Sequence, residues 1–123
     1  MIKGFSDTIA SIILSTFINL SDNPKYDFTD YEFNRAEVFC LAQTIWFESL
    51  GQSRLDNKLV GFTVVNRVKD RRWPGDVCSV VYQKSQFSWT SRSAEIKLTT
   101  ELRKRKWREK IKLAILILSL IHI

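Results

Sequence analysis

A single carboxylate inside an apolar stretch is the first feature of this sequence that could do chemistry. The stretch TIWFESLGQSR covers residues 44–54, and Glu48 follows two aromatic residues in it. A carboxyl group at the end of an apolar helix faces the negative end of the helix dipole, among groups that disfavour its charged form. A carboxyl group kept protonated near neutral pH is what general acid catalysis uses. Glu48 is therefore a candidate catalytic acid; the alternative is a surface glutamate at a frayed helix end.

Two helices are predicted around this residue. Residues 35–50 carry apolar side chains at i, i+3, i+4 and i+7, and Gly51 is suited to end that helix. Residues 56–70 contain the run FTVV, which is typical of a strand, but their apolar spacing fits a helix better, with Asp56 as its N-cap. Gly61 in that helix costs about 1 kcal/mol relative to Ala. That cost is tolerable where another helix crosses closely.

The second half of the chain is predicted to contain a turn, a short helix, a loop and a long helix. The turn is RRWPGDV, and Asp76 within it can cap the short helix. Residues 83–92 read as a loop. The long helix is predicted from Ser93 onward, with Leu98 and Leu102 on its apolar side.

The predicted loop carries side chains that suit sugar binding. Gln86 and Ser88 offer an amide and a hydroxyl for sugar hydroxyls, and an exposed Trp89 indole could stack on a pyranose face. The alternative is a core loop in which Phe87 and Trp89 are buried. The sequence alone leaves both interpretations of the two aromatics open.

Composition indicates one folded domain with a localised positive charge. The chain has 123 residues, is 45% hydrophobic and carries a net charge of +6. Residues 103–112 hold seven bases and one acid, a net of 7 − 1 = +6, so the rest of the chain sums to zero. Nucleic-acid binding is not predicted, because only Trp107 interleaves the bases and no reader motif is present. A solvated helix face is favoured, with attraction to an anionic polymer as a secondary effect.

The cysteine and histidine content predicts no metal site and no cofactor. Cys40 and Cys78 show no CxxC spacing, and the only histidine is His122. The two cysteines could form one disulfide. Two buried small apolar side chains are the favoured alternative.

The amino-terminal region is predicted to be a helix and linker, not a membrane anchor. The apolar run over residues 9–18 is too short to span a bilayer, and a signal peptide is disfavoured by the neighbouring Asp7 and the lack of a cleavage pattern. Ile9, Ile12, Ile13 and Phe17 fit an amphipathic helix packed on the domain.

Two longer blocks carry a family resemblance. They are LAQTIWFESLGQS and LVGFTVVNRVKDRRWPGDVCSVVYQKSQFSW, in this order within residues 36–92 and followed by a helix. The second block keeps Asn66-Arg67 and the run VVYQ over residues 80–83. Together they resemble the cell-wall hydrolase family that includes spore cortex-lytic enzymes and some phage lysins.

The resemblance implies a mainly α, lysozyme-like or lytic-transglycosylase-like domain. It implies cleavage of peptidoglycan glycan strands between N-acetylmuramic acid and N-acetylglucosamine. Glu48 would be the single catalytic acid of a transglycosylase that forms a 1,6-anhydro sugar, and Asn66, Gln86, Ser88 and Trp89 would bind substrate. The enzyme would be a monomer acting in the cell wall or periplasm, or a phage lysin released from the host cytoplasm.

The sequence also departs from the family pattern. Leu50 and Gln52 stand where the family has Arg and Glu, which favours, as the alternative function, a catalytically impaired peptidoglycan-binding or structural module. The chain stops before a segment with which the family usually continues, and its last residues, LSLIHI, match translated sequencing-adapter sequence. We therefore expect residues 1–34 to form a helix and linker, residues 35–117 a truncated catalytic domain, and residues 118–123 a non-native tail.

Overall fold

The computed structural model describes residues 12–16, 18–19, 34–49, 54–83, 87–91 and 96–121, and within them the protein is mainly helical with no strand. After a short helical segment at residues 12–16, the elements are α2 (Arg35–Ser49), α3 (Arg54–Lys69), α4 (Val77–Val81), the 3₁₀ helix η1 (Ser88–Ser91) and α5 (Glu101–Ile121). The predicted mainly α fold is confirmed, and its lysozyme-like subtype remains a prediction.

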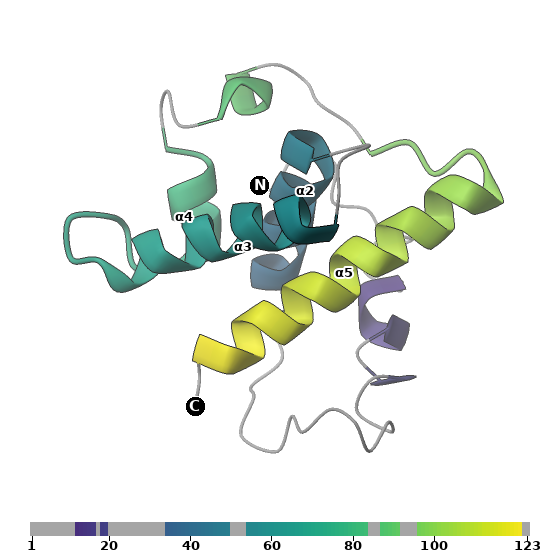
Figure 1. Ribbon diagram of the computed structural model, residues 1–123, viewed down its shortest axis with the longest axis horizontal. Coiled ribbons are helices and arrows are strands. Elements are labelled where there is room, and N and C mark those ends of the chain that lie inside the picture. The colour runs from purple at the N-terminus through teal and green to yellow at the C-terminus, as the bar shows by residue number, and fades with distance from the viewer. Residues whose placement is uncertain are drawn as a thin grey trace.

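Helix α2 is the centre of the domain. Its residues 38–46 are all buried, and α3, α4 and α5 all pack against it (Figure 1). The sequence VFCLAQTIW is apolar on nearly every side, and a helix of that kind is stable when other elements surround it. Asn34 starts the helix, because its Oδ1 accepts a hydrogen bond from the backbone N–H of Glu37 at 3.1 Å. The helix predicted over residues 35–50 is confirmed.

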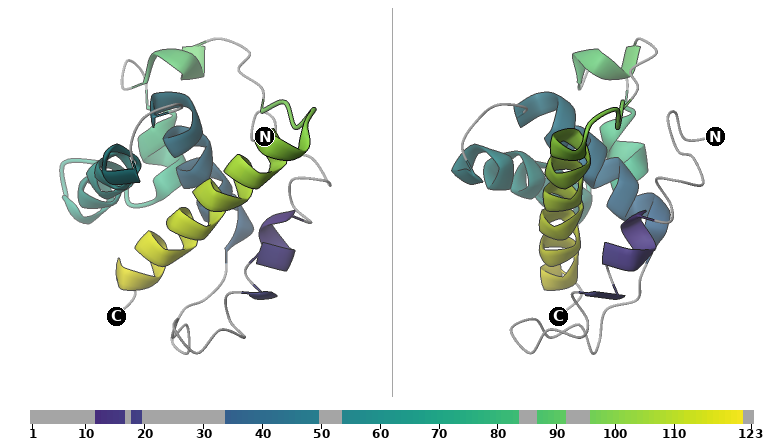
Figure 2. Two further views of the ribbon diagram at one scale, coloured as in Figure 1. Left: turned by 45° about the vertical axis from the view of Figure 1, so that its right-hand side comes forward. Right: turned by 90° about the vertical axis from the view of Figure 1, so that its right-hand side faces the viewer.

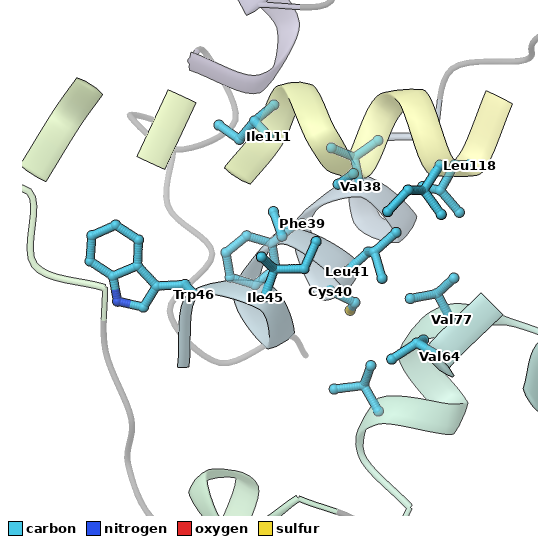
Figure 3. Packing of buried hydrophobic residues seen from close by; sticks show 14 of the residues in the cluster. Val38, Phe39, Cys40, Leu41, Ile45, Trp46, Val64, Val77, Ile111 and Leu118 are labelled. Carbon is cyan, nitrogen blue, oxygen red and sulfur yellow. The ribbon is translucent and has the colours of Figure 1, made fainter. Parts of the chain in front are cut away.

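An aromatic group joins α2 to α5. The Trp107 ring on α5 packs edge to face against the rings of Phe39 and Trp46 on α2. The ring centroids lie 6.1 Å and 5.9 Å from that of Trp107, respectively. Figure 3 shows Phe39, Ile45 and Trp46 on α2, with Ile111 and Leu118 on α5. Leu118, the first residue of the predicted tail, is 1% exposed.

Helix α3 crosses both α2 and α5 at Gly61. A Cβ atom at this position would collide with Cδ1 of Ile117 on α5 and would lie 3.4 Å from Cδ1 of Ile45 on α2. The expectation that another helix crosses closely at Gly61 is therefore confirmed, and so is the choice of helix over strand. The N-cap prediction is wrong, because the helix begins at Arg54 and Asp56 lies in its first turn.

Helix α4 is short and is fastened to α2. Asp76 caps it as predicted, with Oδ1 accepting from the backbone N–H of Ser79 at 2.8 Å. A disulfide joins Cys40 on α2 to Cys78 on α4, with the Cα atoms 5.2 Å apart. The favoured prediction of two unpaired buried cysteines is therefore wrong. Nothing in the spacing of two cysteines 38 residues apart reveals that their helices pack together.

Helix α5 starts later than predicted. Residues 96–99 are not helical, and Thr100 begins α5 by accepting a hydrogen bond at Oγ1 from the backbone N–H of Arg103 at 3.1 Å. Leu98 therefore precedes the helix, where it packs against the core. Leu102 is 49% exposed, because the buried side of α5 follows Trp107, Ile111, Ala114, Ile115 and Leu118 instead.

The amino-terminal helical segment packs on the domain, as predicted. Ile13 is buried in the core and Ile12 packs against it. The segment lies beside α5 in both views of Figure 2. Ile9 and the side chain of Phe17 lie outside the described residues. In the part of the chain that is described, no helix is both long and apolar enough to cross a membrane.

Candidate active site

Glu48 lies where α2 leaves the core. The residues before it, from Val38 to Trp46, are buried, whereas Phe47 and Glu48 are partly buried in the last turn. The backbone of α2 is thus fixed by its packing on three helices up to two residues before Glu48. No described side chain forms a hydrogen bond or ion pair with the Glu48 carboxyl group, so packing rather than polar contacts holds its backbone.

Four aromatic side chains, including Phe47 directly before Glu48, form a group centred on Trp89, and we call them the aromatic cluster. Phe47 stacks on Trp89 of η1, with ring centroids 5.0 Å apart and an angle of 29°. Tyr82 packs on Trp89 in a T-shaped arrangement, with ring centroids 5.9 Å apart, and the ring centroid of Phe87 lies 6.3 Å from that of Trp89. Trp89 is 3% exposed. For Trp89 the core-loop interpretation is correct, and the exposed indole is not observed.

A buried hydrogen bond also links the aromatic cluster to α2. The Tyr82 hydroxyl donates to Oε1 of Gln43 at 2.5 Å, and Gln43 is 1% exposed. Burial raises the pKa of the Tyr82 phenol, an effect that the bond to Gln43 partly offsets. Gln43 lies one helical turn before Phe47, so Tyr82 fixes the same stretch of α2 that Trp89 contacts.

Arg67 extends the aromatic cluster onto α3. Its guanidinium carbon lies 4.7 Å from the ring centroid of Trp73 and 5.9 Å from that of Phe87. Both distances are within the range of cation–π attraction. The family resemblance includes the pair Asn66-Arg67 and implies a role only for Asn66, whereas Arg67 is the residue of the pair that contacts the aromatic rings.

The remaining predicted site residues are Asn66, Ser88 and Gln86. Asn66 is exposed on α3, one turn from exposed Phe62. Ser88 lies in η1 beside Trp89, but its side chain and all of Gln86 lie outside the described residues. The structure thus brings Trp89 to the residue next to Glu48, and leaves Asn66 on the outer surface of α3.

Glu37, a carboxylate on the same helix as Glu48, has another task. Glu37 Oε2 accepts a hydrogen bond from the backbone N–H of Val77 at 3.0 Å, so it helps to cap α4. Eleven residues of helix separate Glu37 from Glu48, about 16 Å at 1.5 Å per residue. Asp76 is also engaged, at the N-cap of α4.

Two buried polar atoms lie in the same region. Oε1 of Gln83 and Nε1 of Trp89 have no hydrogen-bond partner among the described residues. The described residues also contain no group of three His, Cys, Asp or Glu side chains that could hold a metal ion.

Comparison with known families decides the identity of the chain. The family described as "Cell Wall Hydrolase" matches residues 51–119, more than half of the chain. The chain belongs to the cell wall hydrolase family. Family membership indicates peptidoglycan as the substrate of this cell wall hydrolase. No curated protein and no solved structure matched it.

The matched segment has an informative boundary. It begins three residues after Glu48, so it includes α3, α4, η1 and most of α5 but leaves out α2. Tyr82, Trp89 and Arg67 of this cell wall hydrolase therefore lie inside the match, and Glu48 lies just before it. Phe47 of the aromatic cluster lies four residues before the start of the match.

Proposed function

We propose that this protein cleaves peptidoglycan glycan strands between N-acetylmuramic acid and N-acetylglucosamine, with Glu48 as the single general acid and base. The proposal rests on family membership over residues 51–119 together with the partly buried position of Glu48 at the adjoining end of α2. A carboxyl group on a rigid helix end can be positioned to deliver a proton to a bound substrate.

The proposed reaction needs only one protein carboxyl group. Glu48 protonates the glycosidic oxygen as the bond from that oxygen to the anomeric carbon breaks. Its carboxylate then takes the proton of the C6 hydroxyl, whose oxygen attacks the same anomeric carbon and closes a 1,6-anhydro ring. The proton returns to Glu48 and no water is consumed. The placement of Glu37 supports this route, because enzymes with two carboxyl groups hold them about 5–9.5 Å apart.

We assign the aromatic cluster to positioning. Trp89, being buried, supports Phe47 and through it the backbone of Glu48, and contact with sugar hydroxyls falls to Gln86, Ser88 and Asn66. We further propose a lysozyme-like arrangement with residues 35–117 as the catalytic domain and residues 1–34 as its amino-terminal helix and linker. The disulfide supports action outside the reducing cytoplasm, in the wall or periplasm.

The substitution Glu48→Gln tests the proposal. Gln is nearly isosteric with Glu but carries no transferable proton, so lysis of purified peptidoglycan should fall by roughly 10²–10⁴-fold. Circular dichroism and the melting temperature should stay unchanged, and mass spectrometry of wild-type products should find 1,6-anhydro ends. Lysis within tenfold of wild type by the folded variant would exclude Glu48 as the acid.

One observation favours a second function. Leu50 and Gln52 replace the Arg and Glu of the family pattern, as expected for a module that binds peptidoglycan without cleaving it. The same assay separates the two functions. A binding module would sediment with purified walls but release no soluble fragments, and Glu48→Gln would change neither result.

A further inference from the structure

The net charge of the protein is concentrated on one helix. Residues 103–112 of α5 carry the whole net charge of +6, since the remainder of the chain sums to zero. Four of these bases are exposed, namely Arg105, Lys106, Arg108 and Lys112. We call these four residues the basic face.

The basic face is not neutralised by neighbours. Among the residues that the structure describes, the ion pair on α5 joins Lys104 to Glu101 at 3.4 Å and involves none of the four. Lys110 points elsewhere, because its Nζ donates to Oδ1 of Asn57 on α3 at 2.9 Å. Glu109 is the one acid within the run, so the basic face keeps most of its charge for a partner.

Helical spacing aligns the charges. Arg105, Arg108 and Lys112 are related as i, i+3 and i+7, so they share one stripe about 10 Å long at 1.5 Å per residue. A stripe of this kind suits a polymer with several anionic groups better than a single ion.

The basic run begins near the candidate active site, but the basic face points away from it. Arg103, at the start of the basic run, lies over the ring of Trp46 at 5.2 Å, and Trp46 comes two residues before Glu48. Figure 3 shows Trp46 near the amino-terminal part of α5. Arg105, Arg108 and Lys112 lie about 100–160° around α5 from buried Trp107, so an anionic polymer on the basic face would lie along the outer side of α5.

We propose that the basic face of α5 binds the free carboxylates of the peptide chains of peptidoglycan and so holds the protein on the wall. The identity of this polymer rests on the proposed function. Two other polyanions fit less well. Trp107, the one aromatic residue among the bases, is 0% exposed, so no ring is available to stack on nucleic-acid bases. The apolar side of α5 is buried in the core and cannot enter a lipid surface.

The test measures binding without cleavage. All proteins carry Glu48→Gln, and their sedimentation with peptidoglycan free of other wall polymers is measured. The test variant is Arg105→Gln/Arg108→Gln/Lys112→Gln. The matched control, Lys58→Gln/Lys69→Gln/Arg71→Gln, removes three other exposed bases and changes the net charge equally.

We expect the test variant to bind about tenfold more weakly, the sum of three exposed charge contacts. The control should stay within about twofold of the parent, and the difference should shrink near 0.5 M salt, where the Debye length is only about 4 Å. Peptidoglycan whose carboxylates have been amidated should bind all three proteins equally.

Three results would overturn the inference: equal weakening by both triple variants, unchanged binding to amidated peptidoglycan, or tighter binding to a DNA duplex than to peptidoglycan at the same salt. Failure of the proposed function would appear separately. In that case the wild-type protein would release no fragments from peptidoglycan, whatever the sedimentation of the variants.

Discussion

Tyr82 is the residue that joins most parts of the candidate site. Its hydroxyl donates to Gln43 inside α2, and its ring edge meets Trp89, which in turn stacks on Phe47. Both connections end on one turn of α2, just before Glu48. Because the acceptor is an uncharged amide, the pair is satisfied without burying a charge.

Removing this hydroxyl should cost stability. In Tyr82→Phe the Gln43 oxygen loses this donor, so the free energy of unfolding should fall by about 0.5–1.5 kcal/mol near pH 7. Burial raises the pKa of Tyr82 above its ordinary value of 10.0. The stabilisation from the neutral phenol is therefore present below about pH 10 and is lost as pH rises through the raised pKa.

Urea unfolding of wild type and Tyr82→Phe across this pH range checks both statements. The difference between the two proteins should narrow in alkali, with every other titrating group common to both. If the difference in free energy of unfolding between wild type and Tyr82→Phe stays constant from neutral to alkaline pH, the pKa of Tyr82 is not raised by folding.

At the same scale, local patterns predicted some structural features and missed others. The end of α2 next to Glu48 and the N-cap Asp76 were predictable because helix ends and caps are visible within a few residues of sequence. The catalytic role of Glu48 stays a prediction. Gln43 and Tyr82 lie 39 residues apart, and nothing in their neighbourhoods indicates that they meet. Trp89 illustrates the same limit, since burial of an aromatic loop residue depends on what folds over it.

At the scale of elements, apolar periodicity predicted α2 and α3 well because each helix buries a long run of side chains. It failed at the start of α5, where the capping hydroxyl of Thr100 sets the boundary. The crossing of α3 with α5 depends instead on a missing side chain. Gly61 lets Ile117 and Ile45 approach the α3 backbone, and the helix keeps a residue of poor propensity there.

A double-mutant cycle measures the balance between helix propensity and close packing at Gly61. Gly61→Ala alone gains about 1 kcal/mol of helix propensity but costs about 1–3 kcal/mol of overpacking, so it should not stabilise. Ile117→Val removes the Cδ1 atom that the new Cβ would meet. In that background Gly61→Ala should raise the free energy of unfolding by up to about 1 kcal/mol. Equal effects in both backgrounds would mean that the crossing is not close at this point.

At the scale of the whole molecule, the family match and the folded core have different boundaries. The match starts at residue 51, whereas α2, against which α3, α4 and α5 all pack, ends at Ser49. The helices of the matched segment therefore pack mainly against α2, which lies outside the match. The disulfide bridges this boundary, because Cys40 lies before the match and Cys78 within it.

The bridge should contribute strongly to global stability. It closes a loop between residues 38 apart in the chain. In the chain-entropy account such a closure is worth about 4 kcal/mol at 25 °C. Cys40→Ala/Cys78→Ala should therefore melt well below wild type, and the loss should reach the active site, because α4 leads into Tyr82 and the aromatic cluster.

Reductant provides the control, because the alternative of two unpaired buried cysteines predicts a different result. Dithiothreitol should lower the melting temperature of wild type toward that of the double-Ala variant and leave the variant itself unchanged. Peptidoglycan lysis should fall with the same reductant dependence, because the five residues of α4 would then rest on α2 through packing and weak polar contacts such as the hydrogen bond from the backbone N–H of Val77 to Glu37. If oxidised and reduced wild type melt at one temperature, the bridge is absent in solution and packing alone holds α4 on α2.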